Sequence, residues 1–207
     1  MIQEVVAIID RSGSMSGKEA DTIGGVNTTI EELKKNKTKE ETIRFSVKFF
    51  DDHEDLKLRS LNIDEVRPLK ISDLRPRGQT ALLDAMGTTL SFFINEKITK
   101  PNAFESCIIY VATDGFENCS RKYNNKMIKN LIEHGKKLGI EVLYLAANQD
   151  AILEASKFGL DATNAMDYSE TTQNTQEAYR SAGHAAKRAR SGISVAFSQV
   201  ERAKSTK

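Results

Sequence analysis

Short apolar runs alternate along the chain with longer segments in which apolar residues recur every three or four positions. The runs at 5–9 and 107–112 are apolar throughout, which is typical of strands buried on both faces of a sheet. Residues 42–50 alternate apolar and polar positions instead, which predicts a strand with one buried face. Helical spacing is found at 18–35, 80–95, 124–137 and 151–158.

The second predicted strand leads into an acidic turn at 51–55, and a third strand follows near 56–63. A turn this tight predicts an antiparallel pair at the edge of the sheet. We interpret the acidic turn as a solvated hairpin tip rather than as a metal site. Two further strands are predicted at 141–147 and, as a short edge strand, at 165–168.

Alternating strands and helices with fully apolar central strands indicate an α/β fold. We predict a doubly wound, Rossmann-like, three-layer sandwich over residues 1–172, with a mostly parallel sheet and helices on both faces. Residues 173–207 read as a basic C-terminal helix or tail, packed on the domain or extending from it. Its helical stripe runs to Val200, and Gly183 and Gly192 weaken it by roughly 1 kcal/mol each.

The charge and cysteine content of the chain limit the classes of function that it can have. The formal net charge of +1 predicts neither nucleic acid nor a membrane surface as a partner. The cluster of Lys187, Arg188 and Arg190 keeps a nucleic-acid-associated role open as an alternative. Two cysteines that form no close metal-type pair, with no recognisable signal peptide or membrane-length apolar stretch, lead us to expect a cytoplasmic protein of a bacterium or a phage.

Oxygen-bearing side chains gather in three loops, two of which directly follow apolar strands. Ligands of such sheets bind at the carboxyl ends of the strands, where these loops are expected to meet. Two carboxylates and three hydroxyls, without Cys or His, suit Mg²⁺, Mn²⁺ or Ca²⁺ and are poor ligands for Zn²⁺. The candidate metal ligands are Asp10, Ser12, Ser14, Thr80 and Asp114.

Each loop also has an ordinary structural interpretation, because the serines and Thr80 could cap helices and Asp114-Gly115 could form a turn. Their joint placement at one edge of the sheet favours a metal site. Two carboxylates only neutralise a divalent ion, so an open position on it would favour an anionic ligand. An Asp or Glu carboxylate of a protein partner is the natural candidate.

The pattern Asp-x-Ser-x-Ser at 10–14, a later Thr80 and Thr-Asp-Gly at 113–115 resembles the metal-ion-dependent adhesion site of the von Willebrand factor A, or integrin I-like, domain family. The resemblance covers roughly residues 2–170. It implies a sheet order of 3-2-1-4-5-6 with strand 3 antiparallel. It also implies that the serines bind the metal directly, and that the threonine and aspartates bind it directly or through water. The stretches 21–25, 80–85 and 148–151 resemble short, single-domain bacterial members.

Enzymatic alternatives fit less well. A phosphatase of the haloacid dehalogenase type would use Asp10 as nucleophile but needs an acid two residues later, where Ser12 stands. We therefore predict a protein-binding module that is not an enzyme, with a metal-dependent phosphohydrolase as a weaker alternative. Arg11, Phe116 and Glu117 flank the metal loops and are candidate partner contacts, of which the aromatic is the best. Arg11 and Glu117 can equally be ordinary surface charges.

Overall fold

The computed structural model describes residues 1–147 and 150–206, and in this part the strands form a six-stranded sheet of order β3-β2-β1-β4-β5-β6. All neighbouring strands are parallel except β2 and β3. The predicted order and the antiparallel third strand are therefore confirmed. Of the stretch 148–151, Asn148 and Gln149 lie outside the described residues. The strands are β1 (Ile2–Asp10), β2 (Thr42–Phe50), β3 (Glu54–Asn62), β4 (Ser106–Thr113), β5 (Ile140–Ala147) and β6 (Ala165–Tyr168).

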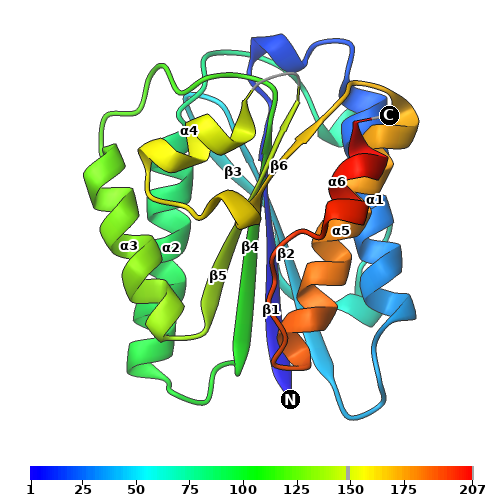
Figure 1. Ribbon diagram of the computed structural model, residues 1–207, viewed down its shortest axis with the longest axis vertical. Coiled ribbons are helices and arrows are strands. Elements are labelled where there is room, and N and C mark those ends of the chain that lie inside the picture. Colours follow the sequence, from blue (N-terminus) through cyan, green and yellow to red (C-terminus); the bar gives the residue numbers. More distant parts are fainter. Residues whose placement is uncertain (148–149, 207) are drawn as a thin grey trace.

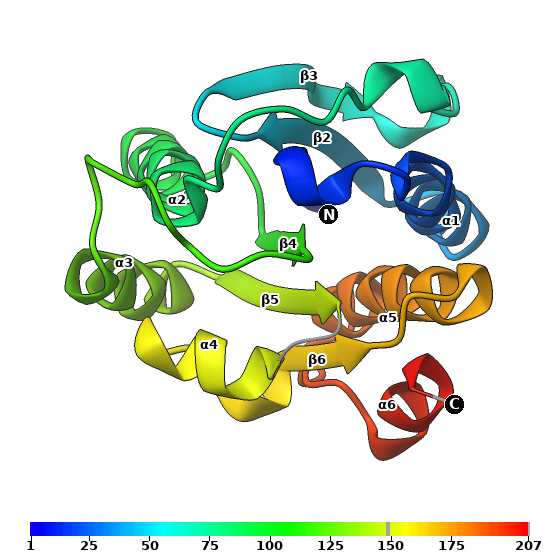
Figure 2. The ribbon, with the colours of Figure 1, turned by 90° about the horizontal axis from the view of Figure 1, so that it is seen from above.

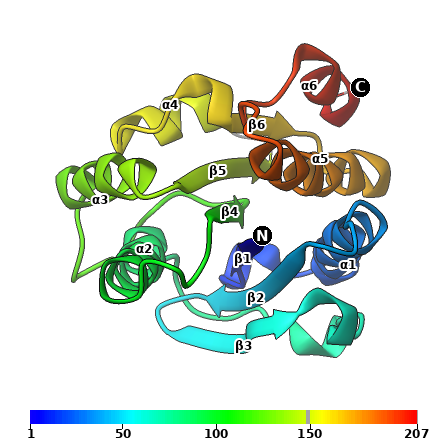
Figure 3. The same ribbon diagram turned by 90° about the horizontal axis from the view of Figure 1, so that it is seen from below.

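Helices cover both faces of this sheet, which confirms the three-layer, Rossmann-like architecture. Seen from above, α2, α3 and α4 lie on one side of the sheet and α1, α5 and α6 on the other (Figure 2). The view from below shows the same division (Figure 3). The helices are α1 (Glu19–Lys35), α2 (Leu82–Thr99), α3 (Asn125–Lys137), α4 (Ala151–Lys157), α5 (Thr172–Arg190) and α6 (Gln199–Ser205). Among the described residues, none of these helices has the length and apolar character needed to cross a membrane.

The central strand β1 explains why its sequence is apolar throughout. Val5 and Ile9 pack in the cluster shared with α1 and α5, whereas Val6 and Ile8 pack in the cluster on the α2 side. All four side chains are at most 2% exposed. Since both faces of the strand are buried, apolar side chains are needed at successive positions.

The C-terminal helical stripe is broken, so the prediction of one stripe reaching Val200 is wrong. Helix α5 ends at Arg190, and Gly192 adopts a left-handed conformation with φ +68°. Glycine reaches this conformation without strain, and it ends the helix. Ile193 and Val200 are consequently 58% and 64% exposed. A separate short helix, α6, begins after Ser198, whose hydroxyl caps it.

Candidate metal centre

The three loops identified in the sequence meet at the carboxyl edge of the sheet, at the top of Figure 1. Strands β1 and β4 are parallel neighbours in which Ile9 pairs with Ala112, so Asp10 and Asp114 leave the sheet side by side. The first loop is tied to the second by a hydrogen bond from the Gly13 amide to the Gly78 carbonyl, 3.2 Å long. The fold thus delivers all three loops to one place.

The side-chain oxygens of these loops converge on a single point. A Cβ atom built on Gly115 would lie 3.3 Å from Thr80 Oγ1, 3.5 Å from Ser14 Oγ and 3.9 Å from Asp10 Oδ2. Ser14 Oγ also donates a 2.7 Å hydrogen bond to Asp114 Oδ1 and lies 3.1 Å from Ser12 Oγ. The structure therefore brings together the five residues proposed as metal ligands. At position 115 a larger residue would be close to the Thr80 hydroxyl, while its distances to the other two oxygens are ordinary van der Waals contacts.

Asp10 is fully buried, and two neighbours hold its carboxylate in place. Oδ1 accepts a hydrogen bond from the Ser12 amide at 2.6 Å, and Oδ2 accepts one from Thr113 Oγ1 at 2.5 Å. Burial raises the pKa of Asp10, and these hydrogen bonds oppose that rise only in part. A carboxylate in this environment is favoured by a nearby cation. The Thr113 hydroxyl was not among the residues predicted from sequence.

A lysine that was not among the candidate residues, Lys18, lies beside the site. Lys18 Nζ is 2.5 Å from Asp114 Oδ2 and also forms an ion pair with Glu170. Burial lowers the pKa of Lys18, but the hydrogen bonds to Asp114 and Glu170 outweigh it and raise the pKa overall. The Asp114 side chain is only 2% exposed. An ion bound by Asp114 must therefore share that carboxylate with an ammonium group or displace it.

Beneath the first two loops a cluster of charges surrounds the buried carboxylate of Asp51. Asp51 is 0% exposed and accepts hydrogen bonds from Arg11 Nε at 2.9 Å and from Arg77 Nε at 2.8 Å. Burial alone would raise the pKa of Asp51, but the hydrogen bonds and charges of the two arginines hold it below its ordinary value. Asp51 is thus not part of a solvated hairpin tip. Arg11 is 7% exposed and does not lie on the surface, where both of its interpretations from sequence placed it.

The loop after β4 is organised by Glu117. Its carboxylate accepts hydrogen bonds from the amides of Leu83, Cys119 and Ser120, at 2.7–3.0 Å, and so pins the loop to the start of α2. Its acceptor oxygens therefore serve the protein's own backbone. Phe116, in contrast, is 58% exposed, and the Nζ atom of Lys157 lies 5.9 Å from its ring centroid. Of the three candidate partner contacts, it is the one with a large exposed side chain.

A second group of possible ligand atoms lies at the tip of the β2–β3 hairpin. One atom from each of Asp51, Asp52 and His53 lies within 4.8 Å of the others. The Asp51 carboxylate already binds two arginines, which leaves two exposed residues to hold an ion. The site around Asp10 offers more oxygens and a matching donor set, because two carboxylates and three hydroxyls suit a hard divalent ion.

Comparison with known proteins identifies solved structures that have a similar fold. No protein-family model matches the chain, and no curated protein matches it by sequence. Among solved structures, the vWF domain of the type V pili tip protein Mfa5 from Porphyromonas gingivalis has a TM-score of 0.63 at 12% identity, covering 92% of this chain and 96% of that one. A von Willebrand factor type A protein from Catenulispora acidiphila has a TM-score of 0.61 at 18% identity, covering 89% and 42%.

Proximal thread matrix protein 1 from the mussel byssus, in a structure whose metal-ion-dependent adhesion site (MIDAS) motif is occupied by zinc, has a TM-score of 0.59 at 15% identity, covering 89% of this chain and 46% of that one. The chain thus spans less than half the length of the mussel and Catenulispora proteins. These similarities in strand order and helix placement establish that the chain has the von Willebrand factor A fold.

Proposed function

We propose that this chain is a protein-binding module that depends on a divalent metal ion held by Asp10, Ser12, Ser14, Thr80 and Asp114. The observation that carries the proposal is the convergence of Thr80 Oγ1, Ser14 Oγ and Asp10 Oδ2 around one point. The mussel protein, whose structure has a zinc-occupied MIDAS motif, supports divalent-metal binding by this fold. The oxygen-only donor set favours Mg²⁺, Mn²⁺ or Ca²⁺.

The partner is proposed to supply an Asp or Glu carboxylate to the ion. Asp10 and Asp114 together neutralise only the ion's two charges, and the ammonium of Lys18 lies close to the same carboxylates. The site therefore favours an anionic ligand at any open position on the ion. Phe116 follows Asp114 by two residues and has an exposed ring, which suits an apolar contact with a partner. In this role the ion recognises the partner and carries out no reaction.

Calorimetric titration with Mg²⁺ and Mn²⁺ tests the metal site. We expect one site in the wild-type protein and its loss in Asp10→Ala. Asp52→Ala is the matched control, because it removes an exposed carboxylate of the hairpin cluster and leaves the proposed site intact. Loss of binding in Asp52→Ala together with full binding in Asp10→Ala would move the ion to the hairpin tip and end the proposal.

The partner chemistry can be tested without knowing the partner. Mn²⁺ bound to the protein relaxes the protons of the water it coordinates, and a carboxylate that displaces this water lowers the relaxation rate. N-acetylglutamate amide should lower the rate in a saturable manner, and N-acetylglutamine amide should not. Equal behaviour of the two compounds would show that the ion does not select a carboxylate.

The alternative roles gain less support. Lys187, Arg188 and Arg190, which motivated a nucleic-acid role, make hydrogen bonds or ion pairs within the chain. Arg190 is 7% exposed and Arg188 pairs with Glu201, which leaves Lys187 as the exposed cation of the three. Filter binding at low salt tests this alternative directly, because phosphate contacts are strongest there. Absence of enzymatic activity and a cytoplasmic location in a bacterium or phage-infected cell remain part of the proposal.

A further inference from the structure

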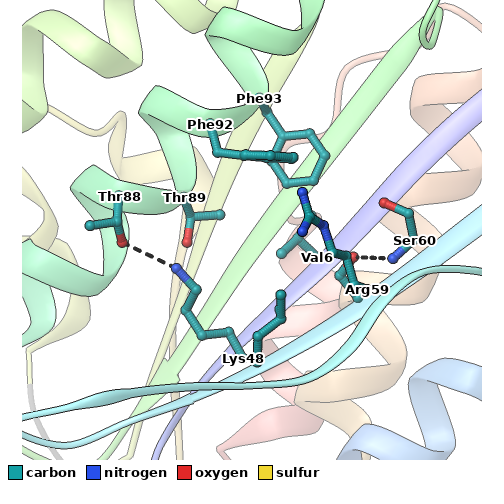
Figure 4. Close-up of a pocket in the computed structure, with 10 residues that line it drawn as sticks. Val6, Lys48, Arg59, Ser60, Thr88, Thr89, Phe92 and Phe93 are labelled. Carbon is teal, nitrogen blue, oxygen red and sulfur yellow. Dashed lines mark hydrogen bonds between the residues drawn. The ribbon is translucent and has the colours of Figure 1, made fainter.

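A cleft of about 240 Å³ lies between α2 and the β2–β3 hairpin (Figure 4). It is on the α2 side of the sheet, and none of its lining residues belongs to the proposed metal site. Its apolar walls come from β1, β3 and α2. These apolar residues are Val6, Leu56, Phe92 and Phe93.

The shape of the cleft depends on an irregularity in β3. The β2–β3 pairing shifts register between Phe45 and Val47, and again between Val47 and Lys48. Ser60 adopts a left-handed conformation with φ +45°, and its amide donates a 2.8 Å hydrogen bond to Ser46 Oγ. In a regular strand, successive side chains point to opposite faces. Because of the bulge, Arg59 and Ser60 both line the same cleft.

The walls of the cleft combine a buried floor with an exposed mouth. Val6 and Phe93 are 2% and 5% exposed, whereas Phe92 and Leu56 are 39% and 48% exposed. The two phenylalanine rings meet edge to face, with centroids 5.0 Å apart. An aromatic or branched aliphatic group entering the cleft would therefore contact apolar surface on several sides and cover surface that now faces water.

The charges around the cleft leave one cation unbalanced. Lys48 Nζ is neutralised by Glu54 Oε2 at 2.6 Å, and it also donates to Thr88 Oγ1 at 3.1 Å. The Arg59 guanidinium instead lies over the Phe92 ring, 5.0 Å from its centroid, as Figure 4 shows. Within residues 1–147 and 150–206, no carboxylate lies within ion-pair distance of Arg59. A planar cation held on an aromatic ring is well placed to receive a carboxylate.

We propose that this cleft binds a small carboxylate with an aromatic or branched aliphatic body, of about the size of 3-phenylpropionate. The apolar body would lie against Val6 and Phe93, and the carboxylate would accept hydrogen bonds from Arg59. The volume of the cleft is below the usual range for drug-sized ligands, which points to a small molecule. This site is independent of the metal site, so the ligand binds with or without a divalent ion.

Two-dimensional amide NMR of the full chain, titrated with 3-phenylpropionate in metal-free buffer, tests the proposal. A ligand of this size should bind with a Kd on the order of a millimolar, with the largest shifts at Ser46, Thr88 and Thr89. The neutral analogue 3-phenylpropanamide should bind at least about fivefold more weakly, because it cannot form the charge-assisted contact with Arg59. A titration in saturating Mg²⁺ should give the same Kd.

Variants separate the two parts of the site. Arg59→Gln should bind the acid and the amide equally, whereas Arg67→Gln, which changes an exposed arginine outside the cleft, should keep the preference for the acid. Phe92→Ala should weaken both ligands. The proposal is overturned if wild-type protein shows no shifts around the cleft, if it binds acid and amide alike, or if Arg59→Gln keeps the preference.

Discussion

Replacing Lys18 with methionine should strengthen metal binding at the Asp10–Asp114 site. Lys18 Nζ lies 2.5 Å from Asp114 Oδ2, and the ion pair with Glu170 holds it there from the other side. The ammonium therefore occupies one of the two carboxylates that a divalent ion would use. Methionine keeps most of the length of the side chain and removes only the charge, so the change tests electrostatic competition and not packing.

The expected gain follows from two contributions. An exposed ion pair stabilises by about 0.2–1 kcal/mol, and the upper end applies here because the Asp114 side chain is only 2% exposed. Repulsion between an ammonium and a divalent ion about 4 Å away is on the order of 2 kcal/mol in water. The Lys18 side chain is 32% exposed and can turn toward Glu170 or the solvent, which relieves most of this repulsion. A net effect of about 1–1.4 kcal/mol corresponds to a five- to tenfold lower Kd.

Calorimetric titration with Mg²⁺ at about 0.15 M salt, where the Debye length is about 8 Å, measures the effect. Glu170→Gln is the companion variant, because it removes a negative charge near the site and leaves the Lys18 ammonium with Asp114 alone. We expect its Mg²⁺ affinity to fall while that of Lys18→Met rises. If Lys18→Met binds Mg²⁺ as the wild type does, or more weakly, the ammonium does not compete with the ion.

Three further predictions concern stability. Asp51→Asn should lower the free energy of unfolding, measured by urea denaturation, by about 2 kcal/mol, because buried Arg11 would keep only the exposed Asp55 as its anion. A loss under about 1 kcal/mol would show that Asp55 and solvent replace the pair. Since the pKa of Asp51 is lowered in the folded protein, its contribution is present above the unfolded-state pKa and is lost as pH falls through the folded pKa. The stability difference between wild type and Asp51→Asn should therefore shrink below about pH 4, and a difference that grows there would contradict this assignment. Gly24→Ala should raise the Tm, because a Cβ there meets nothing within 4 Å. Gly25→Ala should lower the Tm, because its Cβ would lie 2.6 Å from the Tyr179 ring. Equal shifts in Tm for the two variants would show that α1 and α5 separate easily.

The strands could be predicted where the pattern of apolar residues reflects which faces are buried. The run 107–112 is apolar because β4 is covered on both faces, and the alternation at 42–50 reflects a face of β2 that is fully buried opposite a face that is only partly buried. The end of α5 could not be predicted in the same way. The apolar spacing continues past Gly192, but the backbone turns left-handed at that residue and the chain stays non-helical up to the start of α6 at Gln199. A periodic pattern indicates which face is buried but does not show where the chain turns away.

In the candidate site, too, some residues could be predicted from the sequence and others could not. The five oxygen-bearing residues were predictable because a strand end and a loop position fix where each points. Lys18 and Asp114 are 96 positions apart in sequence, and Arg11 and Asp51 are 40 apart. Nothing in the spacing of these residues indicates that they meet, since the contact is made by the parallel packing of β1, β2 and β4. The sequence therefore predicts Arg11 on the surface, whereas its contact with Asp51 at the end of β2 buries it.

These two ion-pair groups act on different properties of the same site. Arg11 and Asp51 lie beneath the loops and are nearly inaccessible to water, so breaking the pair leaves a buried charge with only one exposed partner, Asp55 for Arg11 or Arg77 for Asp51. Lys18 lies at the rim, where water can replace either of its partners, so its loss costs little stability. Its charge, however, acts directly on the carboxylate that would bind the ion. Asp51→Asn should consequently lower stability more than metal affinity in the folded protein, and Lys18→Met should change metal affinity more than stability.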